Sequence, residues 1–207
     1  MIKLIVFDLW DTLAYKYTKV GGTGHLIRVM KPGIARKKFV KIFENSLQTK
    51  RWRSKYAAYR DLCREVGFPA TRENVQMLIG LRNYSESKTQ LFKHTLPMLK
   101  KLRKERYRIG LISNTSIFAT SKLKKKTRLF DLIDYPLFSY DAGMIKPDPR
   151  IFRKMLKIAK VRPSEAIMIG DKMDDDVLAA RKVGMNAIQF KNPQDLKKKF
   201  SSYGVKI

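Results

Sequence analysis

Acidic residues are scarce in this chain, but many of them gather in two short segments. The sequence has 18 Asp and Glu residues against 45 Lys and Arg residues. Six of the 18 acids lie in Asp8–Asp11 and Asp171–Asp176. Clustered carboxylate oxygens are the ligands that a hard divalent cation such as Mg²⁺ prefers. The clustering therefore predicts a metal site built from these two segments.

Hydroxyl, amide, ammonium and carboxylate side chains follow apolar runs that are typical of buried strands. These runs alternate with helical patterns, and this order predicts a parallel sheet with helices on both faces. Ligands bind such sheets at the carboxyl ends of the strands. A hydroxyl, an ammonium and the carboxylates should therefore meet in one crevice. The expected strands and the residues that follow them are 2–7 with Asp8 and Thr12, 108–113 with Ser113 and Asn114, 133–138 with Lys146, 166–169 with Asp171, and 186–190.

The chain changes character between the first and second of these strands. Helical spacing of Ile, Phe, Leu and Val runs through residues 35–47, 55–66 and 72–81. Gly21-Gly22-Thr23-Gly24 lacks the Lys-Ser/Thr that ends a phosphate-binding loop, so it is expected to be a flexible hinge or loop. The segment reads as a helical insertion.

The rest of the pattern completes the fold class. Helices are expected through Leu96, Leu99 and Leu102, and at 117–126, 149–159 and 175–183. The predicted fold is α/β, a Rossmann-like, doubly wound parallel sheet with an inserted helical segment. Residues 1–14 plus 88–207 should form the core and residues 15–87 the insertion, which the resemblance described next implies is a helical cap.

Four segments carry a resemblance to a known family. They are Phe-Asp-Leu-Trp-Asp-Thr-Leu at 7–13, Ile-Ser-Asn-Thr-Ser at 112–116, Ser-Tyr-Asp-Ala-Gly-Met-Ile-Lys-Pro-Asp-Pro-Arg-Ile-Phe at 139–152, and Ile-Gly-Asp-Lys-Met-Asp-Asp-Asp-Val at 169–177. They resemble the four ordered motifs of the haloacid dehalogenase-like superfamily. The helical segment stands where that family inserts its cap. One motif would be weak evidence, whereas four in order, each after an expected strand, are strong evidence.

The resemblance implies a hydrolase in which Asp8 attacks phosphorus and water then hydrolyses the aspartyl-phosphate. It implies that Mg²⁺ is held by Asp8, by the backbone carbonyl of Trp10 and by Asp171. Asp176 matches the second acidic position of the last motif. Asp175 stands one residue away and stays an alternative for that position.

The resemblance also implies roles for the remaining side chains. Ser113 and neighbouring backbone N–H groups would hold the phosphoryl oxygens, and Lys146 would neutralise the charge shared by the phosphate and Asp8. Thr12 and Asn114 are expected to help bind the substrate. Taken singly, each residue has an ordinary alternative as a helix cap or a surface charge.

Trp10 departs from the pattern of the family. Most of its phosphatases carry there a second aspartate that protonates the leaving group, while the dehalogenase branch has a bulky aromatic residue. That branch lacks the metal carboxylates, which this chain keeps. We therefore predict a metal-dependent phosphohydrolase for a small phosphorylated metabolite, which either handles good leaving groups or uses Asp11 as the acid. A 2-haloacid dehalogenase is the alternative.

The net charge of +27 attracts polyanions whatever the fold. The basic excess is spread along the chain, so solvated helix faces are the ordinary explanation. A nucleic-acid-associated member of the fold with weak or no phosphatase activity is a further alternative. The oligomeric state stays open.

The composition also bears on location. The early apolar run at 4–10 is far shorter than the roughly 20 residues that a bilayer span requires. No small-residue cleavage site follows it, so neither a signal peptide nor an anchor is expected. Cys63 is the only cysteine, which excludes an internal disulfide. We expect a cytoplasmic protein that makes no membrane contact.

Overall fold

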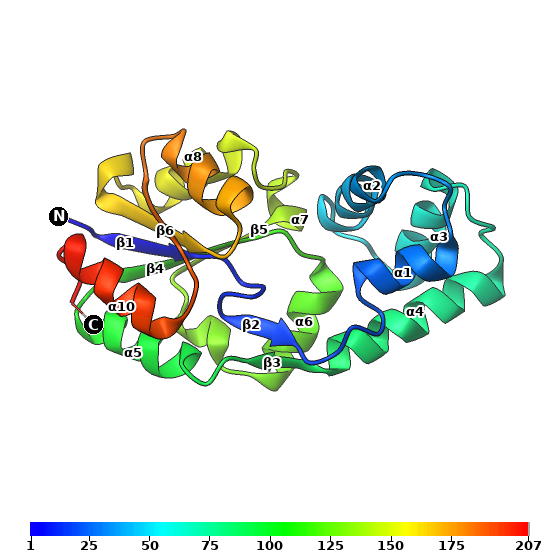
Figure 1. The fold of residues 1–207 in the computed structure, drawn as a ribbon, viewed down its shortest axis with the longest axis horizontal. Coiled ribbons are helices and arrows are strands. Elements are labelled where there is room, and N and C mark those ends of the chain that lie inside the picture. Colours follow the sequence, from blue (N-terminus) through cyan, green and yellow to red (C-terminus); the bar gives the residue numbers. More distant parts are fainter. Residues whose placement is uncertain (207) are drawn as a thin grey trace.

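The computed structural model describes residues 1–206 and is built around one parallel sheet (Figure 1). The strands lie in the order β5-β4-β1-β6-β7, and each neighbouring pair is parallel. β1 is therefore central, with its carboxyl end in the middle of the sheet edge. The strands are β1 (Leu4–Phe7), β4 (Arg108–Ser113), β5 (Tyr135–Phe138), β6 (Ala166–Gly170) and β7 (Asn186–Gln189).

Apolar side chains of β1 alternate between two buried clusters. Ile5 and Phe7 belong to one cluster, and Leu4 and Val6 belong to the other. The alternation follows from the two-residue period of a strand, and burial on both faces explains the unbroken apolar run. The predicted doubly wound α/β fold is confirmed.

Helices cover both faces of the sheet. The cluster with Phe7 includes side chains of α5 (Thr95–Lys104), α6 (Ile117–Lys126) and α10 (Pro193–Ser202). The cluster with Val6 includes side chains of α7 (Ser139–Ala142), α8 (Pro149–Ala159) and α9 (Ala179–Arg181). A π-helical turn, η3 (Met173–Leu178), precedes α9.

Four further helices pack together beyond the carboxyl ends of the strands, and we call them the helical part (Figure 1). They are α1 (Thr23–Met30), α2 (Arg36–Gln48), α3 (Lys55–Glu65) and α4 (Arg72–Ser87). Their apolar faces form a third buried cluster, separate from the two that flank the sheet. A short antiparallel pair, β2 (Ala14–Lys16) with β3 (Thr89–Leu91), joins this part to the sheet.

Several boundaries differ from the sequence-based prediction. Residues 21–24 are not a loop throughout, because α1 begins at Thr23, with Gly22 as its N-cap. The helix expected at 175–183 is instead η3 followed by α9. β2 and β3 were not predicted, because three-residue strands give too little alternation to detect. The end of α4 was missed because its buried residues there, Arg82, Ser85 and Glu86, are polar.

None of the helices within residues 1–206 is both long and apolar enough to cross a bilayer.

Candidate active site

A cavity of about 200 Å³ lies between the carboxyl ends of the strands and the helical part. Its floor comes from loops that follow β1, β4 and β6, and its other wall comes from β2, α1, α2 and α4. Six carboxylates and four cationic side chains line it. This balance is acidic although the chain as a whole carries +27, so the basic excess lies outside the cavity.

Lys146 bridges two carboxylates at the floor of the cavity. Its Nζ donates to Asp8 Oδ1 at 2.6 Å and also to Asp176 Oδ1. The three residues are only 4%, 6% and 0% exposed, in the order Lys146, Asp8, Asp176. Asp8 directly follows β1, Lys146 lies in the loop between α7 and α8, and Asp176 belongs to η3. The fold thus brings Lys146 next to Asp8, 138 positions away in the sequence, and next to Asp176, 30 positions away.

Burial and the neighbouring charges set the protonation of this group. Burial raises the pKa of Asp8 to about 7, against the attraction of Lys146 and with the repulsion of Asp176. Burial alone would lower the pKa of Lys146, but the carboxylates of Asp8 and Asp176 raise it above its ordinary value. Lys146 is therefore a firmly protonated cation beside Asp8.

Asp171 completes a group that fits a divalent cation. Asp8, Asp171 and Asp176 each offer a carboxylate oxygen, and these oxygens lie within 4.8 Å of one another. Burial raises the pKa of Asp171, and the charge of Asp176 raises it further. The Lys146 ammonium pairs with only two of these three carboxylates, so the excess negative charge suits an oxygen-ligated ion such as Mg²⁺. Trp10 lines the same cavity.

The local backbone separates Asp176 from Asp175. The π-helical turn buries Asp176, whose Oδ2 accepts the backbone N–H of Lys172 at 3.1 Å. Asp175 Oδ2 instead lies 3.2 Å from Lys172 Nζ. Single π-helical turns are frequent at functional sites, because they redirect side chains within a helix. Asp176 is thus the one that joins Asp8 and Asp171.

Gly170 leaves the space that Asp176 occupies. A Cβ at position 170 would lie 2.2 Å from Asp176 Oδ2 and 2.3 Å from its Cγ. Any larger residue would have to displace the carboxylate. The glycine at the end of β6 is therefore required by close approach rather than by an unusual backbone angle.

Three buried hydroxyls beside the carboxylates have no hydrogen-bond partner within the described chain. They are the side-chain hydroxyls of Thr12, Ser113 and Thr115. Buried polar groups are normally paired, so such orphans call for an explanation. Thr12 and Ser113 were predicted from the sequence, whereas Thr115 was not. Of the three, Thr115 lines the cavity, whereas Thr12 and Ser113 are buried and are not among the residues that line it.

Asn114 is brought to the site but supports Lys146. Its Nδ2 donates to the backbone carbonyl of Lys146 at 2.9 Å, and its Oδ1 accepts the backbone N–H of Lys146 at 2.8 Å. The side-chain amide is therefore used to fix the backbone that carries Lys146.

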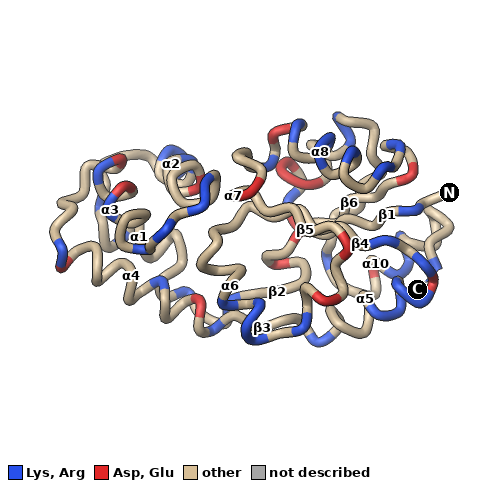
Figure 2. The backbone as a smooth tube through the Cα atoms, turned by 180° about the vertical axis from the view of Figure 1, so that it is seen from behind, with Lys and Arg blue, Asp and Glu red and all other residues tan. Residues whose placement is uncertain are grey.

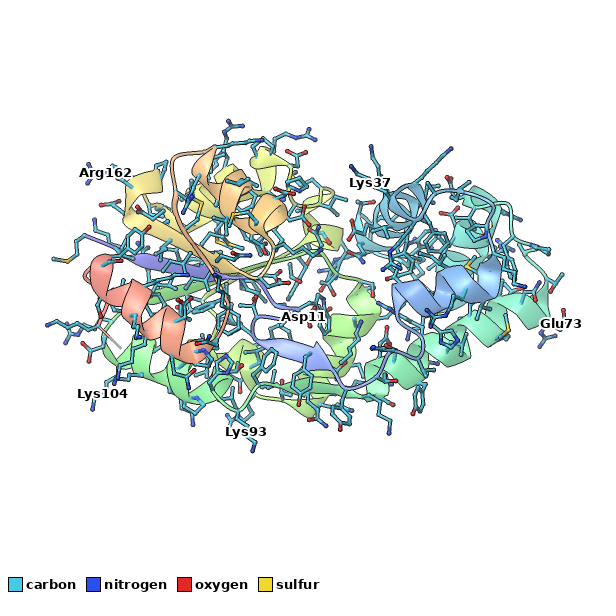
Figure 3. All side chains as sticks on the ribbon, in the orientation of Figure 1. Asp11, Lys37, Glu73, Lys93, Lys104 and Arg162 are labelled. Carbon is cyan, nitrogen blue, oxygen red and sulfur yellow. The ribbon has the colours of Figure 1, made fainter. Side chains whose placement is uncertain are left out.

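Asp11 lies between the sheet and the helical part (Figure 3). It is exposed, has a φ of 60° and lines the cavity. The positive φ turns the chain sharply after Trp10, and the Asp11 N–H bonds to the carbonyl of Ala14 at 2.7 Å. This turn places the Asp11 carboxylate near Asp171, whose pKa it helps to raise.

Sequence reasoning missed the cavity residues that come from the helical part and β2. Arg82 and Gln48 are each 8% exposed, and Lys16 is half-buried. Arg82 and Glu86 are spaced i, i+4 on α4, and this spacing of opposite charges was the only feature of the sequence that pointed to a role for Arg82. The other members of this wall are Gly22, Thr23, Phe43 and Glu44.

Comparison with known proteins gives consistent results. The chain is 27% identical over 197 residues to a glyceraldehyde 3-phosphate phosphatase of Pyrococcus abyssi, a match that covers 92% of this chain and 82% of that protein. The crystal structure of a 2-haloacid dehalogenase from Pseudomonas syringae pv. Tomato superposes with a TM-score of 0.59 and 26% identity, covering 94% and 88% of the chains.

A HAD family enzyme of Bacteroides thetaiotaomicron, solved with magnesium and inorganic phosphate, has a TM-score of 0.70 and 21% identity, covering 97% and 100%. This second structural likeness supports the fold. The sequence model of haloacid dehalogenase-like hydrolases matches residues 2–184. A match over nearly the whole chain, together with the confirmed fold, shows that this protein belongs to the haloacid dehalogenase-like hydrolase family.

Proposed function

We propose that this protein is a metal-dependent phosphatase that hydrolyses a small phosphate monoester through an aspartyl-phosphate on Asp8. The contact of the Lys146 ammonium with both Asp8 and Asp176, next to Asp171, carries the proposal. A buried carboxylate attacks an anionic phosphoryl group only where nearby cations offset the repulsion. The phosphatase name of the Pyrococcus relative supports the same reaction class.

In the first step, Asp8 forms a bond to phosphorus while the bond from phosphorus to the leaving oxygen breaks. Lys146 stays protonated and neutralises the charge shared by Asp8 and the phosphoryl oxygens. The unpartnered hydroxyl of Thr115, which lines the cavity, is our first candidate donor to those oxygens, and the unpartnered hydroxyls of Ser113 and Thr12 are further candidates. In the second step, water hydrolyses the acyl phosphate, which releases inorganic phosphate and restores Asp8. Asp11 is our candidate for the proton of the leaving oxygen, because the Trp10 indole cannot supply it.

The metal would be held by Asp8, Asp171, Asp176 and the backbone carbonyl of Trp10. A bound Mg²⁺ supplies charge neutralisation for the phosphoryl group. Asp175, which pairs with Lys172, is not assigned to it.

We assign residues 1–14 plus 88–207 to a catalytic core and residues 15–87 to a cap that excludes water from the cavity. The antiparallel β2–β3 pair lies at the junction of the two. Arg51 of the helical part pairs with Asp141 of α7, and its guanidinium lies 5.4 Å from the centroid of the Tyr140 ring. These contacts support a cap seated on the core. We place the reaction in the cytoplasm.

Removal of divalent cations tests the proposal. We expect EDTA to abolish hydrolysis of p-nitrophenyl phosphate and added Mg²⁺ to restore it, because the carboxylates of Asp8, Asp171 and Asp176 repel the substrate when no cation is bound. Absorbance of released nitrophenolate measures the rate. Hydrolysis that persists at full rate in EDTA would contradict the assignment. Chelator-resistant release of halide from a 2-haloacid would favour the dehalogenase alternative. The likeness to the Pseudomonas 2-haloacid dehalogenase is the reason to test it.

Lys146→Ala is expected to lower kcat at least about tenfold, which corresponds to about 1.4 kcal/mol of transition-state stabilisation. The charge that faces Asp8 is lost, and no other cation contacts that carboxylate within residues 1–206. Initial-rate kinetics at saturating Mg²⁺ measure the change, and circular dichroism confirms that the variant is folded. The matched control is Lys157→Ala, on the exposed side of α8. Rates within twofold of the parent would place Lys146 outside the reaction.

The nucleic-acid alternative gains no support from the cavity or from the relatives. The cavity holds more carboxylates than cations. Figure 2 shows Lys and Arg distributed over both the sheet-bearing part and the helical part rather than gathered on one element. A spread of this kind is typical of solvated helix faces.

A further inference from the structure

Two cations from outside the four family-like motifs stand in the wall of the cavity that faces Asp8. Lys16 ends β2, and Arg82 lies on α4. Both belong to the wall that the helical part and its β2 connection contribute. Neither has a part in the reaction proposed above.

The positive charge of this pair is only partly neutralised. Arg82 Nη1 donates to the carbonyl of Gly21 at 3.2 Å, and Arg82 Nε lies 3.7 Å from Glu86 Oε1. Glu86 is already bound at 2.6 Å by Lys55. One carboxylate therefore serves two ion-paired cations, and Lys16 lies close enough to both Arg82 and Glu86 to feel their charges.

Lys16 itself has no ion-pair partner in the described part of the chain. Its Nζ lies 4.6 Å from the centroid of the Trp10 ring. Burial and, to a smaller extent, the charge of Arg82 together lower the pKa of Lys16 to about 7, against weaker attraction from Glu86 and Asp11. Glu44 is the acid of this wall; burial raises its pKa, and the attraction that opposes this shift comes from Lys172 and Lys146 rather than from Lys16. An anion between Lys16 and Arg82 would relieve their repulsion.

Gln48 adds an unsatisfied polar group to the same wall. It is 8% exposed, it lines the cavity, and its Oε1 has no hydrogen-bond partner within residues 1–206. A buried amide without a partner costs free energy unless a ligand satisfies it. The orphaned Oε1 can accept only from a donor such as a ligand hydroxyl, whereas the NH₂ group of the same amide can donate to a carboxylate oxygen.

We propose that Lys16, Arg82 and Gln48 form a subsite for a carboxylate, and that the preferred substrate is a short phosphate monoester with a carboxylate at its other end. The proposal rests on the phosphatase function proposed above. A cavity of about 200 Å³ restricts the distance between the two anionic groups to a few bonds. Guanidinium and ammonium groups bind carboxylates by charge-assisted hydrogen bonds. The aldehyde of glyceraldehyde 3-phosphate offers no such charge.

The test compares substrates that differ only in the distal group. With Mg²⁺ present, we expect kcat/KM for 3-phosphoglycerate to exceed that for glyceraldehyde 3-phosphate and for glycerol 3-phosphate at least about tenfold, because a site built for a polar group rejects analogues that lack it. Lys16→Met should reduce this ratio at least about tenfold, and Arg82→Gln should reduce it further. The Lys16 side chain makes no hydrogen bond or ion pair to the described chain, so its variant should fold even if Arg82→Gln does not.

Lys37→Met is the matched control. Lys37 lies exposed on α2, away from the cavity and from Asp11 (Figure 3), and its loss changes the net charge equally. The substrate ratio should be unchanged in this variant. Equal kcat/KM for acid and aldehyde in the parent, or an unchanged ratio in Lys16→Met, would overturn the subsite.

A binding measurement separates this proposal from the proposed reaction. Titration calorimetry of Asp8→Asn protein with Mg²⁺ should show tighter binding of 3-phosphoglycerate than of glycerol 3-phosphate, and Lys16→Met should remove the difference. This result would uphold the subsite even if no phosphate ester were hydrolysed. Hydrolysis of p-nitrophenyl phosphate without any preference for the acid would uphold the phosphatase and reject the subsite.

Discussion

Asp8→Asn is expected to lower kcat for any phosphate ester at least about 10⁴-fold, the scale of loss when a nucleophile is removed. The amide keeps the shape of the side chain but removes the negative charge needed for attack on phosphorus. It also removes one of the three carboxylates that could hold the metal. Single-turnover kinetics with p-nitrophenyl phosphate and saturating Mg²⁺ measure the chemical step directly.

The matched control for this change is Asp174→Asn. Asp174 is exposed, belongs to the same acidic run as Asp176, and does not line the cavity. Its variant should keep the parent rate. Mass spectrometry of the parent trapped with substrate should show added phosphate on Asp8 only. Activity of Asp8→Asn near the parent level would remove Asp8 as the nucleophile, whatever the metal does.

Gly170→Ala is expected to lower kcat at least about 10²-fold, because a misplacement of about 1 Å can cost that much. The new Cβ would lie 2.2 Å from Asp176 Oδ2, so the carboxylate must leave its position between Lys146 and the Lys172 N–H. Both the bridge to Lys146 and the oxygen cluster would then be disturbed. The apparent Mg²⁺ affinity, measured by the rate against Mg²⁺ concentration, should fall together with kcat.

Gly80→Ala is the control for a glycine change. Nothing lies within 4 Å of a Cβ at position 80, which is on α4. Alanine there should leave kcat unchanged and should stabilise the helix by up to about 1 kcal/mol. If Gly170→Ala retained the parent rate and Mg²⁺ affinity, then Asp176 would not have a positional role in the reaction. Thermal unfolding of both variants separates loss of fold from loss of position.

The charge of the protein and the charge of its cavity have different signs, and this difference bears on the substrate. Four cationic and six acidic side chains line the cavity, in a chain of net charge +27. The surface field can gather small anions, but the cavity accepts one only where Lys146, Lys16 or Arg82 faces it. The acidic floor makes a bound cation necessary, which agrees with the expected effect of EDTA.

The sequence by itself determined the sheet, its order of helices and strands, and the residues at the strand ends. This was possible because the signals are local: apolar runs such as Leu4–Phe7 and the residues that follow directly after them, Asp8 and Ser113 among them, are adjacent in the chain. The parallel sheet then requires the ends of β1, β4 and β6 to meet at one edge. The convergence of Asp8 and Asp171 therefore followed from the topology alone.

Only the tertiary structure decided which acidic neighbour joins the site and what the opposite wall contains. The sequence favours Asp176 but leaves Asp175 as an alternative, and the π-helical turn together with the space left by Gly170 separates them. Lys16 and Arg82 lie on different elements, 66 positions apart in the printed sequence, and no local pattern links them. Their meeting depends on contacts between distant parts of the chain, such as the hydrogen bond from Arg82 on α4 to the carbonyl of Gly21. Packing of this kind depends on contacts between residues far apart in the sequence. Hydrophobic periodicity within a single segment cannot predict these contacts.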